Sequence, residues 1–144
     1  MNRKPILVDS SVVVNAFDNT SEDHSVCHKL ILKLKKDNYD ILMPMHVLFE
    51  IHCAMERLIK IEGKYISNPF NEQNQIPFKP IPIDHKFVNN FHDPTLPYIK
   101  SGDFIFLAIA KKLLIPFITS DQKLYEKTKD CELEVYYPEE FLNN

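Results

Sequence analysis

The chain has 144 residues, 44% of them hydrophobic and 26% charged. This length suits one compact domain with its own core and is too short for two ordinary domains. The formal net charge of −3 argues against broad electrostatic contact with nucleic-acid phosphates, so any such contact must be local or assisted by metal. With only two glycines, Gly63 and Gly102, the chain cannot contain the glycine-rich phosphate loops of dinucleotide-binding domains or P-loop enzymes.

Cysteine usage and hydropathy indicate the compartment. The three cysteines are widely spaced and predict no disulfide framework: Cys27, Cys53 and Cys131. We expect reduced, partly buried thiols in a cytoplasmic protein, with Cys53 in the core. No apolar run is long enough to span a membrane. The first apolar run, residues 6–8, stops at Asp9 and is too short for the core of a signal peptide.

The N-terminal half alternates short strands with helices. Residues 6–8 predict a buried strand, because a polar residue closes a continuous apolar run there. Residues 22–36 and 47–61 carry apolar side chains at helical spacing, and Ile59 falls on the apolar stripe of the second helix. Two shorter elements complete this half, a helix at 12–17 and a strand at 39–43.

The C-terminal half continues this alternation. In chain order it predicts a loop at 62–75, an edge strand at best at 76–83, a helix to residue 91 capped by Asp84, a loop at 92–100, a helix at 102–114 capped by Ser101, a strand at 116–119, a helix at 122–128, a strand at 134–137 and a short helix from Pro138. Strands alternating with helices predict an α/β domain with a central, mainly parallel sheet, and we assign residues 1–144 to this single domain.

Three aspartates are expected at one edge of this sheet. Asp9 and Asp121 each follow a predicted strand, and ligands bind outside the carboxyl ends of parallel strands. Asp103 lies in the first turn of a predicted helix. Eighteen residues separate Asp103 from Asp121, enough for a helix, a short loop and a strand that runs back, so both acids should finish at the same end. Glu50 lies near the start of another helix, beside its apolar stripe.

Each acid taken singly has a simpler role, as a helix cap, a partner of a helix dipole, a turn residue or a solvated side chain. Four carboxylates together would repel one another unless protonated or neutralised by metal, and oxygen ligands favour Mg²⁺ or Mn²⁺. A zinc site is not expected, because the pair His24 and His28 and the pair His46 and Glu50 each lack a third ligand. Lys100, close to Asp103 in sequence, is a candidate for contact with a phosphate.

The arrangement resembles the PIN-domain nucleases, and in particular the VapC-type toxins of VapBC toxin–antitoxin systems. The resemblance spans residues 6–137 and is most specific between the third and fourth acids. The residues that carry it are Leu7-Val8-Asp9-Ser10-Ser11, Pro44 followed by Leu48-Phe49-Glu50-Ile51, Ile81-Pro82-Ile83-Asp84, Asp103-Phe104-Ile105 with Ala108-Ile109-Ala110, and Phe117-Ile118-Thr119-Ser120-Asp121. Phe104 stands where the family often has a small residue. Loops 62–75 and 92–100 are longer than the resemblance implies and could change which RNA is admitted, or cover the cleft.

The resemblance implies a three-layer α/β/α fold and a metal-dependent endoribonuclease. One or two Mg²⁺ or Mn²⁺ ions would be held by Asp9, Asp103 and Asp121, while Glu50 would bind metal or orient the attacking water. Ser11 and Thr119 would support the acids through hydrogen bonds. The resemblance further implies RNA as substrate, a homodimer and an antitoxin partner that places an arginine or lysine among the carboxylates.

Three alternatives remain open. The first is a PIN nuclease of RNA processing that has no antitoxin. The second is a non-catalytic, response-regulator-like phosphoacceptor domain, which would need a second acid next to Asp9 and a lysine at the end of a late strand. The third is a phosphatase with an Asp-x-Asp motif, but Ser11 stands where its second aspartate would be.

Overall fold

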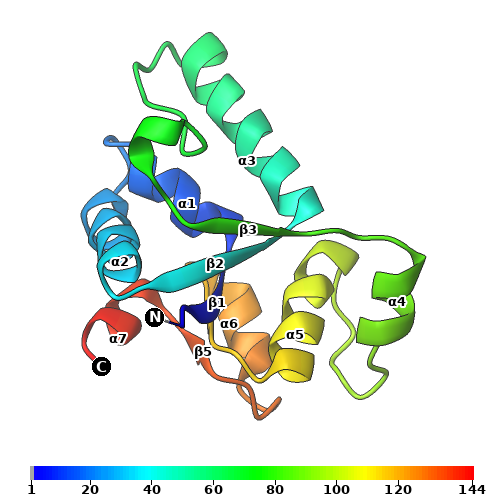
Figure 1. Ribbon diagram of the computed structural model, residues 1–144. Coiled ribbons are helices and arrows are strands. Elements are labelled where there is room, and N and C mark those ends of the chain that lie inside the picture. Colours follow the sequence, from blue (N-terminus) through cyan, green and yellow to red (C-terminus); the bar gives the residue numbers. More distant parts are fainter. Residues whose placement is uncertain (1) are drawn as a thin grey trace.

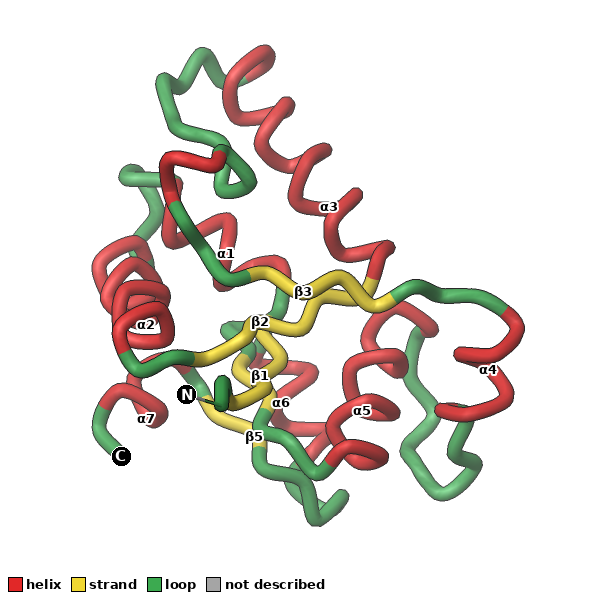
Figure 2. Tube along the Cα trace, in the orientation of Figure 1, coloured by secondary structure: helices red, strands yellow, loops and turns green. Residues whose placement is uncertain are grey.

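The structure is a computed structural model, and it describes residues 2–144. Its strands and helices alternate along the chain, as Figures 1 and 2 show. The elements are β1 (Lys4–Val8), α1 (Ser10–Phe17), α2 (His24–Lys36), β2 (Tyr39–Pro44), α3 (Met45–Glu56), a π-helical turn (Arg57–Ile61), a 3-10 turn (Glu72–Asn74), β3 (Phe78–Ile81), α4 (His85–Phe91), α5 (Ser101–Leu113), β4 (Phe117–Ile118), α6 (Gln122–Thr128), β5 (Val135–Tyr136) and α7 (Pro138–Leu142).

All strand pairs of the sheet are parallel, and the strand order is β3-β2-β1-β4-β5. Helices α1, α2 and α3 lie on one side of the sheet, and α4, α5 and α6 lie on the other (Figure 1). This confirms the predicted α/β fold with its parallel sheet between two helical layers. The proline-containing strand β3 lies at an edge, as expected for a strand whose proline cannot donate a ladder hydrogen bond.

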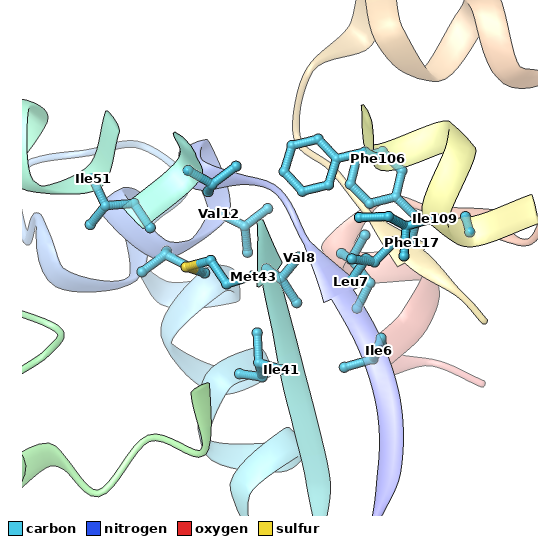
Figure 3. Packing of buried hydrophobic residues seen from close by; sticks show 14 of the residues in the cluster. Ile6, Leu7, Val8, Val12, Ile41, Met43, Ile51, Phe106, Ile109 and Phe117 are labelled. Atoms are coloured by element: carbon cyan, nitrogen blue, oxygen red, sulfur yellow. The ribbon is translucent and has the colours of Figure 1, made fainter. Parts of the chain in front are cut away.

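The core explains why β1 is a continuous apolar run. Ile6, Leu7 and Val8 are completely buried, because helices cover both faces of a parallel sheet. In Figure 3, Val12 of α1 lies on one side of this strand and Phe106 of α5 lies on the other. The ring of Phe106 stacks on Phe117 of β4 with 4.8 Å between centroids, which fixes α5 against the sheet next to the site described below.

The long helix predicted at 47–61 is not α-helical throughout. From Arg57 to Ile61 it becomes a π-helical turn, closed by a 3.1 Å hydrogen bond from the Glu62 amide to the Arg57 carbonyl. Ile59 in this turn is exposed and does not continue the apolar stripe as predicted, whereas its neighbour Leu58 is buried. Cys53 is also exposed, and its predicted place in the core is wrong, because it lies off the stripe of Val47, Ile51 and Met55.

Four helix starts differ from the prediction. Helix α3 begins at Met45, two residues earlier than predicted, and helix α2 begins at His24, two residues later. Helix α1 begins at Ser10, two residues earlier than predicted. Helix α5 is preceded by Lys100 at the N-cap position, and Ser101 is its first helical residue, so the predicted Ser101 cap is wrong. Within residues 2–144, no helix has the length and apolar character needed to cross a membrane.

Candidate functional site

The candidate site lies where the order of strands reverses. Successive strands are added on one side of β1 up to β3, and then β4 is added on its other side. Crevices form at the carboxyl ends of strands at such reversal points. Asp9 directly follows β1, and Asp121 follows β4, with Val8 and Ile118 paired in register. Both acids therefore stand at this crevice.

Asp9 is buried, with only 8% of its surface exposed. It occupies the N-cap position of α1, but its side chain makes no capping hydrogen bond. Instead, Oδ2 accepts a 2.8 Å hydrogen bond from the hydroxyl of Thr119, and the hydroxyls of Ser11 and Ser10 lie 3.4 Å from Oδ2 and Oδ1. Capping of α1 therefore does not explain where the side chain of Asp9 lies.

Thr119 connects Asp9 to Asp121. Its completely buried hydroxyl donates to Asp9 and accepts a 3.0 Å hydrogen bond from the backbone amide of Asp121. Asp121 Oδ1 in turn accepts from the Leu124 amide at 3.1 Å and caps α6. Asp121 thus has the simpler role of a helix cap and also lines the crevice.

Asp103 and Glu50 approach from the two neighbouring helices. Asp103 lies in the first turn of α5, and its Oδ2 is 3.9 Å from the Lys100 ammonium. Glu50 is exposed on α3, and its Oε1 would lie 3.9 Å from a Cβ placed on Gly102. The structure therefore brings all four predicted acids to the wall of one cavity of about 630 Å³, which Ser11 and Lys100 also line.

The carboxylates influence one another electrostatically. Burial raises the pKa of Asp9, and the negative charges of Asp103 and Asp121 raise it further, against the lowering effect of the Thr119 hydrogen bond. Burial also raises the pKa of Asp103, where nearby Asp121 and Glu50 act in the same direction and Lys100 opposes them. Like charges held this close favour binding of a proton or a cation.

The donor set fits a hard divalent cation. Its atoms are carboxylate and hydroxyl oxygens, which Mg²⁺ and Mn²⁺ prefer over the sulfur and nitrogen ligands of zinc sites. Within residues 2–144, no three histidine, cysteine, aspartate or glutamate side chains are close enough to form a ready-made metal-binding group. Mg²⁺ is usually bound through one or two carboxylates and keeps several water ligands, so a looser arrangement of acids is compatible with it.

His46 is part of the cavity wall, although the sequence indicated only its spacing from Glu50. Its Nε2 lies 3.3 Å from the carbonyl oxygen of Gly102, whereas its Nδ1 is buried without a hydrogen-bond partner in the described chain. Asn15 and Asp23 also line the cavity. Sequence reasoning missed both, because no strand end or helical spacing related them to the four acids.

Comparisons with known proteins agree with this geometry. A family model of the PIN domain matches residues 6–130. The chain belongs to the PIN domain family. PIN domains are generally nucleases, and the family match confirms the resemblance read from the sequence. A comparison with curated protein sequences found no match.

Solved structures show the same fold. This PIN domain is similar to a chain in the crystal structure of VapBC2 from Rickettsia felis bound to a DNA fragment from its promoter, with 15% identity, a TM-score of 0.53, and coverage of 92% of this chain and 98% of that chain. It is also similar to a PilT N-terminus domain protein from the hyperthermophilic archaeon Sulfolobus solfataricus P2, with 15% identity, a TM-score of 0.51, and coverage of 96% of this chain and 91% of that chain.

Proposed function

We propose that this PIN domain is a Mg²⁺- or Mn²⁺-dependent endoribonuclease, the toxin of a type II toxin–antitoxin pair. The observation that carries the proposal is the meeting of Asp9, Glu50, Asp103 and Asp121 at one cavity, at the strand-order reversal of a PIN fold. The raised pKa values of Asp9 and Asp103 support it, because burial and, to a smaller extent, mutual repulsion disfavour their charged forms, and a bound cation would stabilise those forms.

Each side chain has a defined task in this proposal. Asp9, Asp103 and Asp121 hold the cation, and Glu50 binds it or orients the attacking water. Thr119 and Ser11 hold the Asp9 carboxylate in place through their hydroxyls. When bound, the cation lowers the pKa of a water for attack on an RNA phosphodiester and stabilises the leaving oxygen. Lys100 contributes a positive charge at the rim of the cavity, where a phosphate would enter.

The toxin assignment extends to partners. The similar Rickettsia felis chain comes from a VapBC2 complex, and we propose a cognate antitoxin for this chain as well. An arginine or lysine of the antitoxin would pair with the carboxylates in place of the cation. We also propose that the chain forms a homodimer and acts in the cytoplasm, where its unpaired cysteines would stay reduced. A small open reading frame next to the gene would support an antitoxin, and its absence would favour a PIN nuclease of RNA processing.

Cleavage assays on the purified protein test the catalytic proposal. We expect cleavage of RNA in the presence of Mn²⁺ or Mg²⁺ and loss of cleavage in EDTA. Asp9→Asn and Asp121→Asn should abolish cleavage with the fold intact, because asparagine preserves hydrogen bonding to Thr119 and to the Leu124 amide. The control is Asp37→Asn, since Asp37 pairs with Lys33 at the end of α2 and does not line the cavity.

Thermal melts of these variants and of Asp103→Asn test cation binding by the acids without a cleavage readout. Mn²⁺ should raise the melting temperature of the parent and of Asp37→Asn, because a ligand that binds only the folded state stabilises it. Asp103→Asn should lose most of this shift. Cleavage by Asp103→Asn at the rate of the parent would show that the four-acid assignment is wrong.

A further inference from the structure

A second cavity adjoins the carboxylate cavity. It encloses about 560 Å³ between the segment 92–100 and the start of α5. Lys100 and Ser101 line both cavities, so the two are neighbours that meet at the start of α5. Pockets of this size bind ligand groups as large as a nucleotide.

The second cavity offers aromatic surface next to a positive charge. The ring of Tyr98 is fully exposed, and Phe104 and His92 line the same cavity with 6.2 Å between their ring centroids. The side chain of Lys100 is 81% exposed. Proteins bind single-stranded nucleic acid by stacking bases on aromatic rings and contacting phosphates with basic side chains, and Tyr98 and Lys100 offer one of each.

The segment that carries Tyr98 is anchored at its start. Asp93 accepts hydrogen bonds from the amide and the hydroxyl of Thr95 and forms a 2.9 Å ion pair with Lys111 of α5. Leu96 is buried in the core. At its other end the segment continues directly into α5. The backbone at Tyr98 and Lys100 therefore runs between two anchored points, which lowers the backbone entropy lost when a ligand binds.

We propose that this second cavity binds the nucleotide adjacent to the scissile phosphate of single-stranded RNA. Tyr98 stacks on the base, and Lys100 contacts the phosphate that passes from the second cavity into the carboxylate cavity. The inference rests on the proposed nuclease function and adds a substrate preference to it. A base within a duplex is paired and stacked on its neighbours, so only a single-stranded or looped nucleotide reaches Tyr98.

Steady-state kinetics test the role of Tyr98. On a single-stranded RNA, Tyr98→Ala should raise KM by about 5- to 150-fold, the change in affinity that loss of one base–aromatic stack gives. The kcat should change little, because this contact is equal in the ground and transition states. Tyr98→Phe should restore the KM of the parent, since stacking needs the ring and not the hydroxyl.

The matched control is Tyr65→Ala. Tyr65 is as exposed as Tyr98 but lines neither cavity. Its segment, 62–75, follows the C-terminal end of α3, away from α5 (Figure 1). Tyr65→Ala should leave both kinetic constants unchanged. If Tyr98→Ala and Tyr65→Ala give the same KM while the parent cleaves RNA, the base subsite is wrong and the nuclease function stands.

Binding of a labelled RNA oligonucleotide to the Asp121→Asn protein gives a readout independent of cleavage. Lys100→Gln should lower the slope of log affinity against log salt by about 0.7, the value for one phosphate contact on a single strand, whereas Lys60→Gln should not. Addition of Tyr98→Ala should weaken binding of the single strand and not of a duplex with the same sequence. Equal weakening of single-strand and duplex binding would overturn the stacking role of Tyr98. If the Asp121→Asn protein binds no RNA and the parent protein cleaves none, the nuclease function itself is refuted.

Discussion

The hydroxyl of Thr119 donates to Asp9 across 110 residues of sequence. The same hydroxyl accepts the Asp121 amide, so one buried side chain sets the positions of two of the four acids. Serine or threonine is needed here because the group must donate to one partner and accept from the other.

Thr119→Val should therefore damage both stability and activity. Valine fills similar space but leaves the Asp9 carboxylate and the Asp121 amide without their partner, at a cost of about 1–3 kcal/mol for an unsatisfied buried group. Urea unfolding measures this loss, and the cleavage assay should show a parallel drop. Thr119→Ser keeps the hydroxyl and should retain most of the activity, and equal activity of the valine and serine variants would show that the hydrogen bond does not matter.

Asp9→Asn should make the metal-free protein more stable at pH 7. Because the pKa of Asp9 is raised in the folded state, that state binds the proton more tightly than the unfolded chain does. Stability then falls as pH rises from the unfolded value of 3.8 through the raised pKa. Asparagine cannot ionise, so the variant does not lose stability in this way at pH 7. At this chain size each kcal/mol gained in the free energy of unfolding raises the melting temperature by about 2–4 °C.

Thermal melts in EDTA at several pH values check this expectation. The advantage of Asp9→Asn should shrink as the pH is lowered, since Asp9 itself becomes neutral. Asp37→Asn serves as the comparison variant. Hydrogen bonding to Lys33 lowers the pKa of Asp37, so replacing this carboxylate with an amide should not stabilise the protein. A less stable Asp9→Asn at pH 7 would contradict the electrostatic account of the site.

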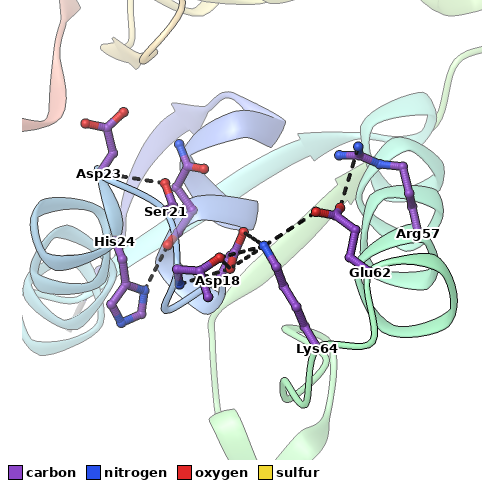
Figure 4. Close-up of polar contacts among 9 residues, drawn as sticks. Asp18, Ser21, Asp23, His24, Arg57, Glu62 and Lys64 are labelled. Atoms are coloured by element: carbon purple, nitrogen blue, oxygen red, sulfur yellow. Dashed lines mark hydrogen bonds and ion pairs between the residues drawn. The ribbon is translucent and has the colours of Figure 1, made fainter.

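Lys64→Met should destabilise the protein through Asp18. Lys64 donates to both oxygens of Asp18, at 3.2 and 3.1 Å, and joins the segment after α3 to the end of α1 (Figure 4). Burial pushes the pKa of Asp18 up, but hydrogen bonds from Thr20 and Lys64 outweigh it and hold the pKa below 3.8. Loss of Lys64 should cost about 1.5–3 kcal/mol, the usual contribution of hydrogen bonds to a charged group.

The pH dependence of this effect has the opposite sign to that of Asp9. A depressed carboxyl pKa stabilises the fold above 3.8, and this contribution is lost as pH falls through the lower, folded-state value. The difference between Lys64→Met and the parent should therefore be largest near neutral pH and vanish in acid. Lys60→Met is the control, since its pair with Glu56 is exposed and should contribute little.

The two glycines should respond oppositely to alanine. At Gly102, a Cβ would meet His46 Nε2 at 3.7 Å, an ordinary contact, so Gly102→Ala should stabilise α5 by about 0.4–1 kcal/mol. Gly63 has a φ of +65°, and Gly63→Ala should cost about 1–2 kcal/mol for the left-handed conformation. Urea midpoints measure both. Since the new methyl group at residue 102 also points toward Glu50, cleavage by Gly102→Ala should fall despite its greater stability.

Sequence reasoning predicted the features that depend on local pattern. The apolar run of β1, the proline-limited β3 and the return of α5 into β4 each follow from periodicity and chain length, and together they place Asp9, Asp103 and Asp121 at one edge. What it missed depends on tertiary packing. The π-helical turn after α3 is one such feature, and the contacts of His46 with Gly102 and Phe106 of α5 are another.

The central place of β1 has a kinetic consequence. During synthesis β1 can pair with β2 soon after both are made, but its other edge has no partner until β4, which follows more than a hundred residues later. Pairings of such long separation form slowly, because the loop must close before any contact forms. A nascent chain that ends before β4 also lacks Thr119 and Asp121. Under the proposed function, the polypeptide therefore stays harmless to RNA until β4 and the residues that follow it have been made.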